Sequence, residues 1–317
     1  MRVFYGTVGS LIMLAVFSFI VFDTVLAAED DNPAATDEYS NGARQCMTCH
    51  KEGKELPAHE IFMTPMGISE DPDSPFAEGN RDCETCHGPS KTHRKKQKDG
   101  TRLPPAITFD ENTPVETQNK VCLDCHNDST MFLWSGSTHD EEEVACANCH
   151  EVHAERDPVF DALTQQQACF SCHPRTRSET FRNSSHPLRF GEMACADCHD
   201  PHNDANDFLL KRSTVNDTCY TCHAEKRGPF LWEHAPVTED CTLCHNAHGS
   251  NHTALLKQRP PLLCQQCHSP SGHPSTAYTS ESAENSFQQR FLLGQSCSNC
   301  HSQVHGSNSP SGVTITR

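Results

Sequence analysis

The sequence is short of the residues that normally build a hydrophobic core. Hydrophobic residues make up 35% of the 317 positions, a figure that already counts 20 cysteines, and aromatic residues make up only 7%. Ordinary globular chains carry roughly 45–50% apolar residues on a comparable count. This composition alone is typical of a disordered chain. If the chain folds, something other than its aliphatic and aromatic side chains must supply apolar surface.

Long hydrophobic runs are also scarce. One run, residues 3–22, follows a short positive start and precedes the tripeptide V-L-A at residues 25–27. This order predicts a secretory signal peptide over residues 1–27, cleaved between Ala27 and Ala28. An uncleaved anchor is the alternative, because the run is about long enough to span a bilayer. Both interpretations place the rest of the chain outside the cytoplasm.

Positively charged residues are also few. Lys and Arg together number 25 against 42 Asp and Glu, which gives a formal net charge of −17. Such a surface argues against nucleic acid as a partner. The exception is the run K-T-H-R-K-K-Q-K at residues 91–98. Most such runs are solvated loops, and the alternative is a docking patch for an acidic partner or for haem propionates.

Cysteine is abundant, and all 20 cysteines lie in ten copies of C-x-x-C-H, the signature of covalent c-type haem attachment. The predicted attachment residues are Cys46, Cys49, Cys83, Cys86, Cys122, Cys125, Cys146, Cys149, Cys169, Cys172, Cys195, Cys198, Cys219, Cys222, Cys241, Cys244, Cys264, Cys267, Cys297 and Cys300. The predicted proximal iron ligands are His50, His87, His126, His150, His173, His199, His223, His245, His268 and His301. The sequence therefore predicts ten covalent haems as iron cofactors.

The spacing explains the chemistry. On a helical turn, positions i, i+3 and i+4 share a face, so two sulfurs can reach the haem vinyl groups while the imidazole reaches the iron. Zinc sites and thioredoxin-like dithiols also use C-x-x-C. Zinc does not require a His after the second Cys, and a dithiol motif needs a βαβ context that this sequence lacks. Haem attachment is the interpretation that explains all ten copies.

The eleven histidines outside the motifs follow a repeat. The motifs form five units, which begin at 46 with 83, 122 with 146, 169 with 195, 219 with 241, and 264 with 297. In every unit one spare His lies between the two motifs and another follows the second motif. These candidate distal ligands are His59, His93, His139, His153, His186, His202, His234, His248, His273 and His305. His252 is left over, and the choice between His248 and His252 stays open.

Two imidazoles per iron predict low-spin, six-coordinate haem. Methionine ligation is the runner-up for any single iron, and Met63 with Met66 is the only methionine cluster. His202 follows the proximal His199 by three residues, so it lies on the same side of that porphyrin. We therefore expect His202 to serve a different haem and to tie two cofactors together.

The predicted fold class is a multihaem cytochrome c: mostly coil, with short α-helices wrapped around an elongated chain of ten haems and negligible β-structure. After the signal peptide we expect an acidic N-terminal tail at 28–45, five-haem halves at 46–173 and 174–305, and a flexible C-terminal tail at 306–317. The repeat runs through the division near Pro174, so one continuous body is expected.

The ten motifs, with segments such as C-E-T-C-H-G-P-S at 83–90 and C-T-L-C-H-N-A-H-G-S at 241–250, resemble the periplasmic decahaem cytochromes of the MtrA/DmsE/PioA/MtoA family. The resemblance covers nearly the whole mature chain. Members of that family insert into a porin-like β-barrel of the outer membrane. They carry electrons between periplasmic or inner-membrane cytochromes and an extracellular cytochrome or terminal reductase.

The resemblance implies an exported, periplasmic electron conduit that a barrel partner holds at the outer membrane. A soluble periplasmic shuttle to a terminal reductase is the alternative. A multihaem reductase is disfavoured, because an enzyme needs an open axial position on one iron and the spare histidines suffice to close every iron. We therefore expect no catalytic residues.

Overall fold

The structure is a computed structural model that describes residues 37–40, 42–128, 131–268, 297–310, 312 and 315. Within these ranges, short helices are joined by coil, and the only β pairing consists of isolated bridges. The α-helices are α1 (Ala43–Cys46), α2 (Cys83–His87), α3 (Val115–Leu123), α4 (Thr138–Glu141), α5 (Gln165–Cys172), α6 (Pro174–Thr180), α7 (Val215–Tyr220), α8 (Ala235–Glu239) and α9 (Leu262–Gln265). The predicted fold class, mostly coil with short helices and negligible β, is confirmed.

Short 3₁₀ helices occupy much of the remaining chain. They are His59–Met63, Pro65–Gly67, Cys146–Asn148, Pro158–Phe160, Pro187–Phe190, Cys195–Asp197, Asp207–Leu209, Ala224–Lys226, Cys241–Leu243, Thr253–Leu255 and Cys297–Asn299. The predicted signal peptide and His273 lie outside the described residues.

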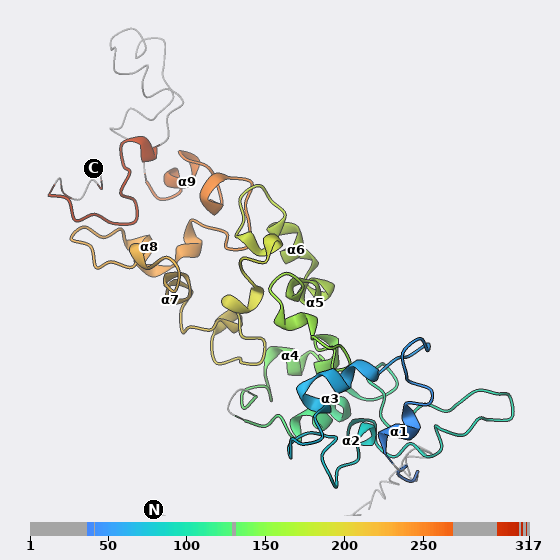
Figure 1. The fold of residues 1–317 in the computed structure, drawn as a ribbon. Coiled ribbons are helices and arrows are strands. Elements are labelled where there is room, and N and C mark those ends of the chain that lie inside the picture. The colour runs from blue at the N-terminus through green and yellow to red at the C-terminus, as the bar shows by residue number, and fades with distance from the viewer. Residues whose placement is uncertain are drawn as a thin grey trace, which may run out of the picture.

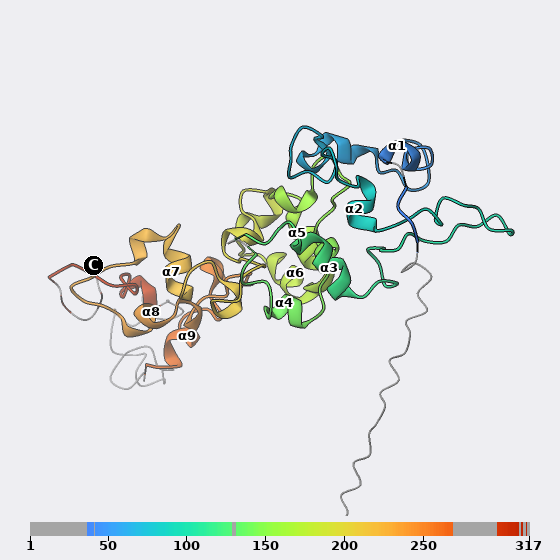
Figure 2. The ribbon, with the colours of Figure 1, turned by 90° about the horizontal axis from the view of Figure 1, so that it is seen from below.

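The elements follow one another along an elongated body. Figure 1 and Figure 2 show α1, α2 and α3 at one end, α4, α5 and α6 in the middle, and α7, α8 and α9 toward the other end. Successive haem motifs therefore advance along the long axis of the molecule. Among the described residues no helix has the length and apolar character needed to cross a membrane.

Few apolar side chains are buried by the polypeptide itself. Among the described residues, the buried hydrophobic ones are Phe76, Ala77, Trp134, Ala145, Phe170 and Leu188. Large apolar side chains such as Phe132, Phe160 and Phe208 are 78–80% exposed to solvent or to the internal cavity described below. The polypeptide alone therefore lacks a core of ordinary size.

Buried amides hold the two motifs of a unit together. Asn119 on α3 accepts the backbone N–H of Cys146 (2.8 Å) and donates to the carbonyl of Val144 (3.0 Å). Asn216 on α7 does the same in the fourth unit, accepting from Cys241 at 2.7 Å. Each Asn lies three residues before the first Cys of its unit. One helix turn therefore carries both a haem cysteine and the Asn whose hydrogen bonds hold the second motif of the unit.

Both ends of the described chain are tied to the body. Asp37 accepts hydrogen bonds from the backbone and hydroxyl of Thr92, each 2.7 Å long. Trp232 exchanges backbone hydrogen bonds with Ser307, and its indole donates to the carbonyl of Ser309. In the segment 306–317, for which we expect flexibility, Ser307 and Ser309 are thus bonded to Trp232, and Ile315 accepts the backbone N–H of Gln303 at 3.1 Å.

Candidate haem-binding sites

Every C-x-x-C-H motif closes a helical turn. In nine motifs the backbone N–H of the His donates to the carbonyl of the first Cys over 2.8–3.1 Å, and α2 spans the remaining motif, Cys83–His87. Most first motifs end an α-helix, whereas the second motifs of the last four units lie on 3₁₀ turns. All 20 cysteines are described, and none forms a disulfide. Each motif thus presents two thiols and an imidazole on one face.

These faces line one continuous cavity of about 6100 Å³. Its wall includes every motif histidine and eight of the spare histidines, together with all motif cysteines except Cys300. Small-molecule sites usually enclose about 300–1,000 Å³. The cavity is several times larger and runs the length of the body, as a row of large flat cofactors requires.

Motif histidines face spare histidines across this cavity. Among the described residues, eight such ring pairs have centroids 5.9–6.4 Å apart. The pairs are His50 with His93, His87 with His153, His173 with His139, His150 with His202, His223 with His186, His199 with His248, His268 with His234, and His245 with His305.

This separation fits one metal ion between two imidazoles. A His nitrogen lies about 2 Å from a metal ion that it ligates. A five-membered ring with sides of about 1.35 Å puts each nitrogen about 1.1 Å from the ring centroid. Counted on both sides of an iron, these lengths predict centroids about 6.2 Å apart. Direct stacking of two rings would not require this constant gap at eight places.

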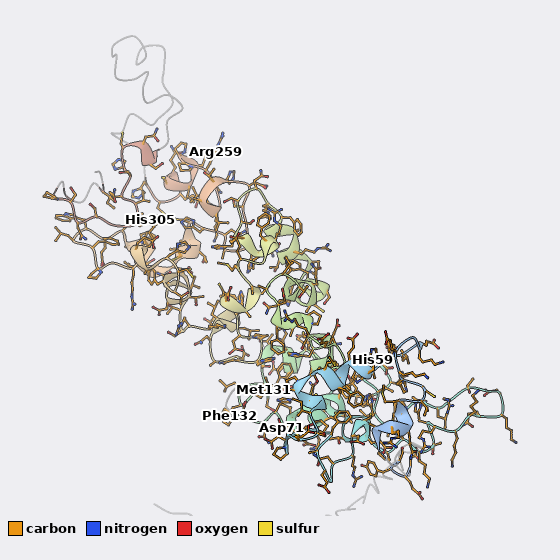
Figure 3. The ribbon with its side chains drawn as sticks, in the orientation of Figure 1. His59, Asp71, Met131, Phe132, Arg259 and His305 are labelled. Carbon is orange, nitrogen blue, oxygen red and sulfur yellow. The ribbon has the colours of Figure 1, made fainter. Side chains whose placement is uncertain are left out.

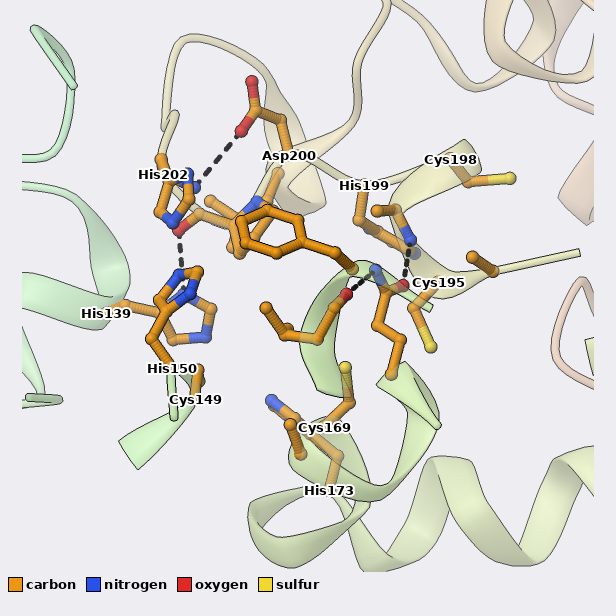
Figure 4. Close-up of a pocket in the computed structure, with 18 of the residues that line it drawn as sticks. His139, Cys149, His150, Cys169, His173, Cys195, Cys198, His199, Asp200 and His202 are labelled. Carbon is orange, nitrogen blue, oxygen red and sulfur yellow. Dashed lines mark hydrogen bonds between the residues drawn. The ribbon is translucent and has the colours of Figure 1, made fainter. Parts of the chain in front are cut away.

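The pairs cross from one unit to the next. In the second, third and fourth units, the His between the two motifs faces the first motif of the following unit, as His139 faces His173. From the second unit on, the His after the second motif faces the second motif of the preceding unit, as His202 faces His150. His93 differs, because it faces His50 of its own unit. Figure 4 shows His139, His150 and His202 gathered on one side of the cavity, away from His199.

In the second, third and fourth units, the His that lies between the two motifs also forms a hydrogen bond to the following unit. Its acceptor is the backbone carbonyl directly before the spare His that follows the second motif of that unit. Nδ1 of His139 donates to the carbonyl of Pro201 (3.1 Å), directly before His202 (Figure 4). The later units repeat this bond: His186 donates to Ala247 at 2.9 Å and His234 donates to Val304 at 2.9 Å. Neighbouring units are therefore joined at the same points that carry their spare imidazoles.

The proximal imidazoles are oriented mainly by backbone carbonyls. Nδ1 of His199 donates to the carbonyl of Phe208 at 2.8 Å, and Nδ1 of His245 donates to that of Ala254 at 2.7 Å. A proton on Nδ1 leaves Nε2 free as the metal-binding nitrogen. Both acceptors lie in left-handed backbone, with φ of 58° at Phe208 and 53° at Ala254. That conformation costs roughly 1–2 kcal/mol per residue, so these loops are strained where they aim a carbonyl at an imidazole.

One proximal imidazole has a different partner. Nδ1 of His150 lies 2.7 Å from the Oδ2 carboxylate atom of Asp157, whose side chain is 14% exposed. In sequence, His150 begins the segment H-E-V-H, which corresponds to H-D-P-H at His199 and to H-N-A-H at His245. A charged acceptor thus takes the place that a peptide carbonyl has in two sister motifs.

Burial keeps the paired imidazoles in the form that binds iron. Removal from water lowers the pKa of His87, and the same cause lowers the pKa of its partner His153. Burial likewise lowers the pKa of His202, His248 and His305. These rings are therefore neutral at pH 7, and only a neutral imidazole has a lone pair for a metal.

The cysteines indicate how consecutive motifs adjoin. Within each unit the thiols of the two first cysteines lie close enough to shift each other's pKa: Cys46 with Cys83, Cys122 with Cys146, Cys169 with Cys195, Cys219 with Cys241, and Cys264 with Cys297. Between units the second cysteines are electrostatic neighbours, as with Cys86 and Cys125 or Cys198 and Cys222. Motifs that are adjacent in sequence are therefore adjacent in space.

A buried hydrogen-bond donor without a partner is also consistent with a bound haem. The Nε1–H group of Trp134 is buried without a partner among the described residues, and the Trp134 ring lies 6.1 Å from that of His202. Buried donors are nearly always satisfied, so a polar group of a cofactor is the natural acceptor. The thiol pairs, the imidazole spacing, the cavity and this donor together fit c-type haem.

The remaining predicted residues are placed as follows. His126 and His301 line the cavity, whereas His59 is near the N-terminal end of the body with its Nδ1 buried and unpartnered (Figure 3). His252 is outside the cavity wall, where it precedes the 3₁₀ helix Thr253–Leu255. Met63 is 67% exposed and is not among the residues that line the cavity.

The residues that orient the imidazoles were not predicted from the sequence. A backbone carbonyl leaves no side-chain signature, so Phe208 and Ala254 have none. The repeated L-L-K at 209–211 and 255–257 is the one signal that could have shown a common loop. In both loops a bridge brings the last Leu back to the motif His, Leu210 to His199 and Leu256 to His245.

Known proteins match parts of this sequence. Residues 83–163 match the family of NrfB-like c-type cytochrome proteins, and residues 186–228 and 234–273 each match the doubled C-x-x-C-H motif. A curated relative, "Multiheme cytochrome MtrA" of Shewanella baltica (strain OS185), is 46% identical over 292 residues, which cover 90% of this chain and 85% of the relative. The chain belongs to the MtrA family of multihaem cytochromes.

Membership in the MtrA family establishes the general chemistry. The chain binds haem covalently through its C-x-x-C-H motifs, and its function is electron transfer. The doubled-motif matches, residues 186–228 and 234–273, include the crossed pair of His199 and His248 and the strained carbonyl loops at Phe208 and Ala254.

Proposed function

We propose that this MtrA-family chain holds ten covalent haems, each closed by two histidines, and passes electrons along them in sequence order. The eight facing pairs supply eight of the proposed ligand sets. Extending the crossing rule assigns His59 to the haem of His126. It leaves His273 for the haem of His301, because the last unit has no following unit to serve. His248, and not His252, is the proposed partner of His199.

The observation that carries the proposal is the crossing of the histidine pairs. Each spare imidazole from the second to the fourth unit would bond an iron that is attached to a neighbouring unit. Neighbouring units are then linked through iron–histidine bonds and cannot move apart. The alternating cysteine neighbours support the same order. Each proposed haem therefore has another haem next to it, and an electron can pass from one to the next along the elongated body (Figure 1).

The proposed role is an electron conduit between the periplasm and the cell exterior. The chain would be exported and then held in the outer membrane by a porin-like β-barrel. It would exchange electrons with a periplasmic or inner-membrane cytochrome on one side and with an extracellular cytochrome or terminal reductase on the other. A rod with a haem motif near each end suits a conduit, because electrons must enter and leave at different places.

Catalysis is not part of the proposal. With two imidazoles on an iron, no axial position is open to a small substrate, and the haem can only gain or lose an electron. The chain's own groups then have three tasks: thiols fix the cofactor, imidazoles close the iron, and carbonyls orient the imidazoles. Ready binding of carbon monoxide or cyanide by the native holoprotein would contradict this view.

The test is capture of the native holoprotein from outer-membrane fractions. A β-barrel protein should co-purify in a stoichiometric complex, and the complex in a sealed vesicle should reduce an acceptor on the opposite side. The variant Cys264→Ser with Cys267→Ser should stay folded and bound to the barrel, yet lose transfer across the vesicle. A holoprotein that is recovered free of any barrel and that transfers electrons only in solution would identify the soluble shuttle instead.

A further inference from the structure

A positively charged hairpin lies at one end of the proposed haem row. Residues 91–103, here called the basic hairpin, contain six basic side chains and one acidic side chain, on a chain whose formal net charge is −17. The hairpin turns at Gly100, which donates to the carbonyl of Gln97, and it is closed by the bridge between Lys96 and Arg102. Figure 1 and Figure 2 show the segment between α2 and α3 projecting from the body at the end that carries α1.

The basic hairpin also carries a candidate iron ligand. His93 faces His50 with ring centroids 6.1 Å apart, and Nδ1 of His93 donates to the carbonyl of Leu103 on the returning strand at 2.5 Å. The hairpin fold therefore positions the imidazole. Among the described residues, the cysteine neighbour of Cys46 in this motif is Cys83 of the following motif, so the haem of His50 would lie at one end of the row.

The basic side chains fall into two groups. Arg94 and Arg102 line the cavity, where they can neutralise the propionates of the end haem. Lys91 is paired with Glu38. The other three, Lys95, Lys96 and Lys98, are exposed, are not among the residues that line the cavity, and form no ion pair within the described part of the chain. Lys95 lies near enough to Asp37 and Glu38 to help lower the pKa of both carboxyl groups. Propionates therefore do not explain these three lysines.

We propose that the basic hairpin is a docking site for an acidic one-electron redox protein, which exchanges electrons with the haem of His50 and His93. An acidic partner is repelled by most of this surface, so the hairpin sets where contact occurs. Such steering raises association rates by 10–10³ and weakens as salt is added. The proposal rests on the proposed haem between these two histidines, and it names the kind of partner that reaches that end of the conduit.

The test uses ten-haem holoprotein and an acidic flavodoxin in its hydroquinone form, mixed by stopped flow at low and high salt. In each encounter one electron passes from the anionic flavin hydroquinone to a ferric haem, which becomes ferrous, and the flavin is left as the neutral semiquinone without release of a proton. The triple variant Lys95→Gln, Lys96→Gln, Lys98→Gln should react at least tenfold more slowly at low salt and lose most of its salt dependence. Redox titration of the variant should still show all ten haems.

The matched control, Lys120→Gln, Arg212→Gln, Arg259→Gln, removes the same charge from three exposed basic residues that do not line the cavity, and it should react like the wild type. The proposal is overturned if the hairpin variant reacts like the wild type or if the control slows equally. It is also overturned if the hairpin lysines govern only binding to vesicles of anionic lipid. None of these rates depends on a β-barrel, so failure here is distinct from failure of the conduit proposal.

Discussion

The carboxylate of Asp157 lies 2.7 Å from Nδ1 of His150, whereas the corresponding nitrogens of His199 and His245 face peptide carbonyls. A carboxylate behind a metal-bound imidazole raises the basicity of that ligand. A more basic ligand, with a negative charge beside it, stabilises ferric over ferrous iron. The same protein thus contains one motif with a carboxylate acceptor and two sister motifs with a carbonyl acceptor. The influence of the carboxylate on the reduction potential can therefore be measured within one molecule.

Replacing Asp157 with Asn should raise the reduction potential of one of the ten proposed haems. The amide oxygen can still accept from His150, and Asn caps a helix as well as Asp does, so the bond from Val159 that caps Pro158–Phe160 is kept. Losing the charge should weaken the ferric preference about tenfold, which is about 59 mV for a one-electron couple. A spectroelectrochemical titration would show one tenth of the haem absorbance moving to higher potential.

The control is Asp207→Asn, which removes an exposed carboxylate from the sister loop that follows His199. It should leave the titration unchanged. If both variants shift a haem equally, general loss of negative charge is the cause, and the Asp157 bond has no special effect.

The choice between His248 and His252 can be settled by two alanine variants. His248→Ala should leave the iron at His199 without its partner, since these rings face each other at 6.1 Å. One haem in ten should then become high-spin and bind carbon monoxide, while the haem of His245 stays low-spin. His252→Ala should leave the spectrum unchanged. The reverse result would mean that the crossing rule fails in the fourth unit.

The crossing could not have been read from the sequence. Ten complete motifs and one spare His in each expected place predict the attachment residues, the histidine inventory and the thin, mostly coil wrapping. The count is equally compatible with self-contained units, because it does not say which way each spare side chain reaches. The three-residue step from His199 to His202 carries directional information, and the steps from His150 to His153 and from His245 to His248 repeat it. Each step says merely that its second His serves another haem.

The residues that orient the iron ligands were even harder to predict from the sequence than the crossing of the histidine pairs. Phe208 and Ala254 act through carbonyls aimed by left-handed backbone, which nothing in a Phe or Ala residue signals. Asp157 is an ordinary acidic residue until its distance to His150 is known. The clasps made by Asn119 and Asn216 share a spacing of three residues before a Cys, but a polar residue before a motif is too common to indicate burial.

Removing the clasp at Asn216 should loosen the fourth unit locally. Asn216→Ala leaves the N–H of Cys241 without its acceptor and the carbonyl of Val237 without its donor. An unsatisfied buried group costs about 1–3 kcal/mol, so amide exchange at Cys241 should speed up by about tenfold to a hundredfold. Asn251→Ala, at an exposed position, is the control. Unchanged exchange in the Asn216 variant would show that the covalent haems alone hold the two motifs together.

Acid should destabilise the holoprotein in a defined range. Burial lowers the pKa of His87, His153 and His305 in the folded state. As pH falls through about 6.5, the unfolded chain takes up protons that these rings exclude, so the folded state loses stability progressively from about pH 7.5 downward. The denaturant midpoint should be slightly lower at pH 6.5 than at pH 7.5, and clearly lower at pH 5.5.

Carboxylates do not obscure this range, because ordinary Asp and Glu side chains titrate near pH 4. Protonation also competes with iron for the imidazole, so a high-spin component should grow over the same interval. A midpoint that is unchanged or higher at pH 5.5 would contradict the assignment of these imidazoles as buried and neutral.

The last prediction concerns what holds the fold together. Within the described residues the polypeptide buries six apolar side chains, while its cavity of about 6100 Å³ is lined by thiols and imidazoles. Apolar burial contributes about 25 cal/mol per Å², and ordering the chain costs roughly 1–2 kcal/mol per residue. So few buried side chains cannot offset that cost, and the haem faces must supply the missing apolar surface. A variant with Ser at all 20 cysteines should therefore be disordered by circular dichroism and rapidly cleaved by protease, whereas holoprotein should resist both heat and protease. A cooperative thermal transition in that variant would show that the polypeptide has a core of its own.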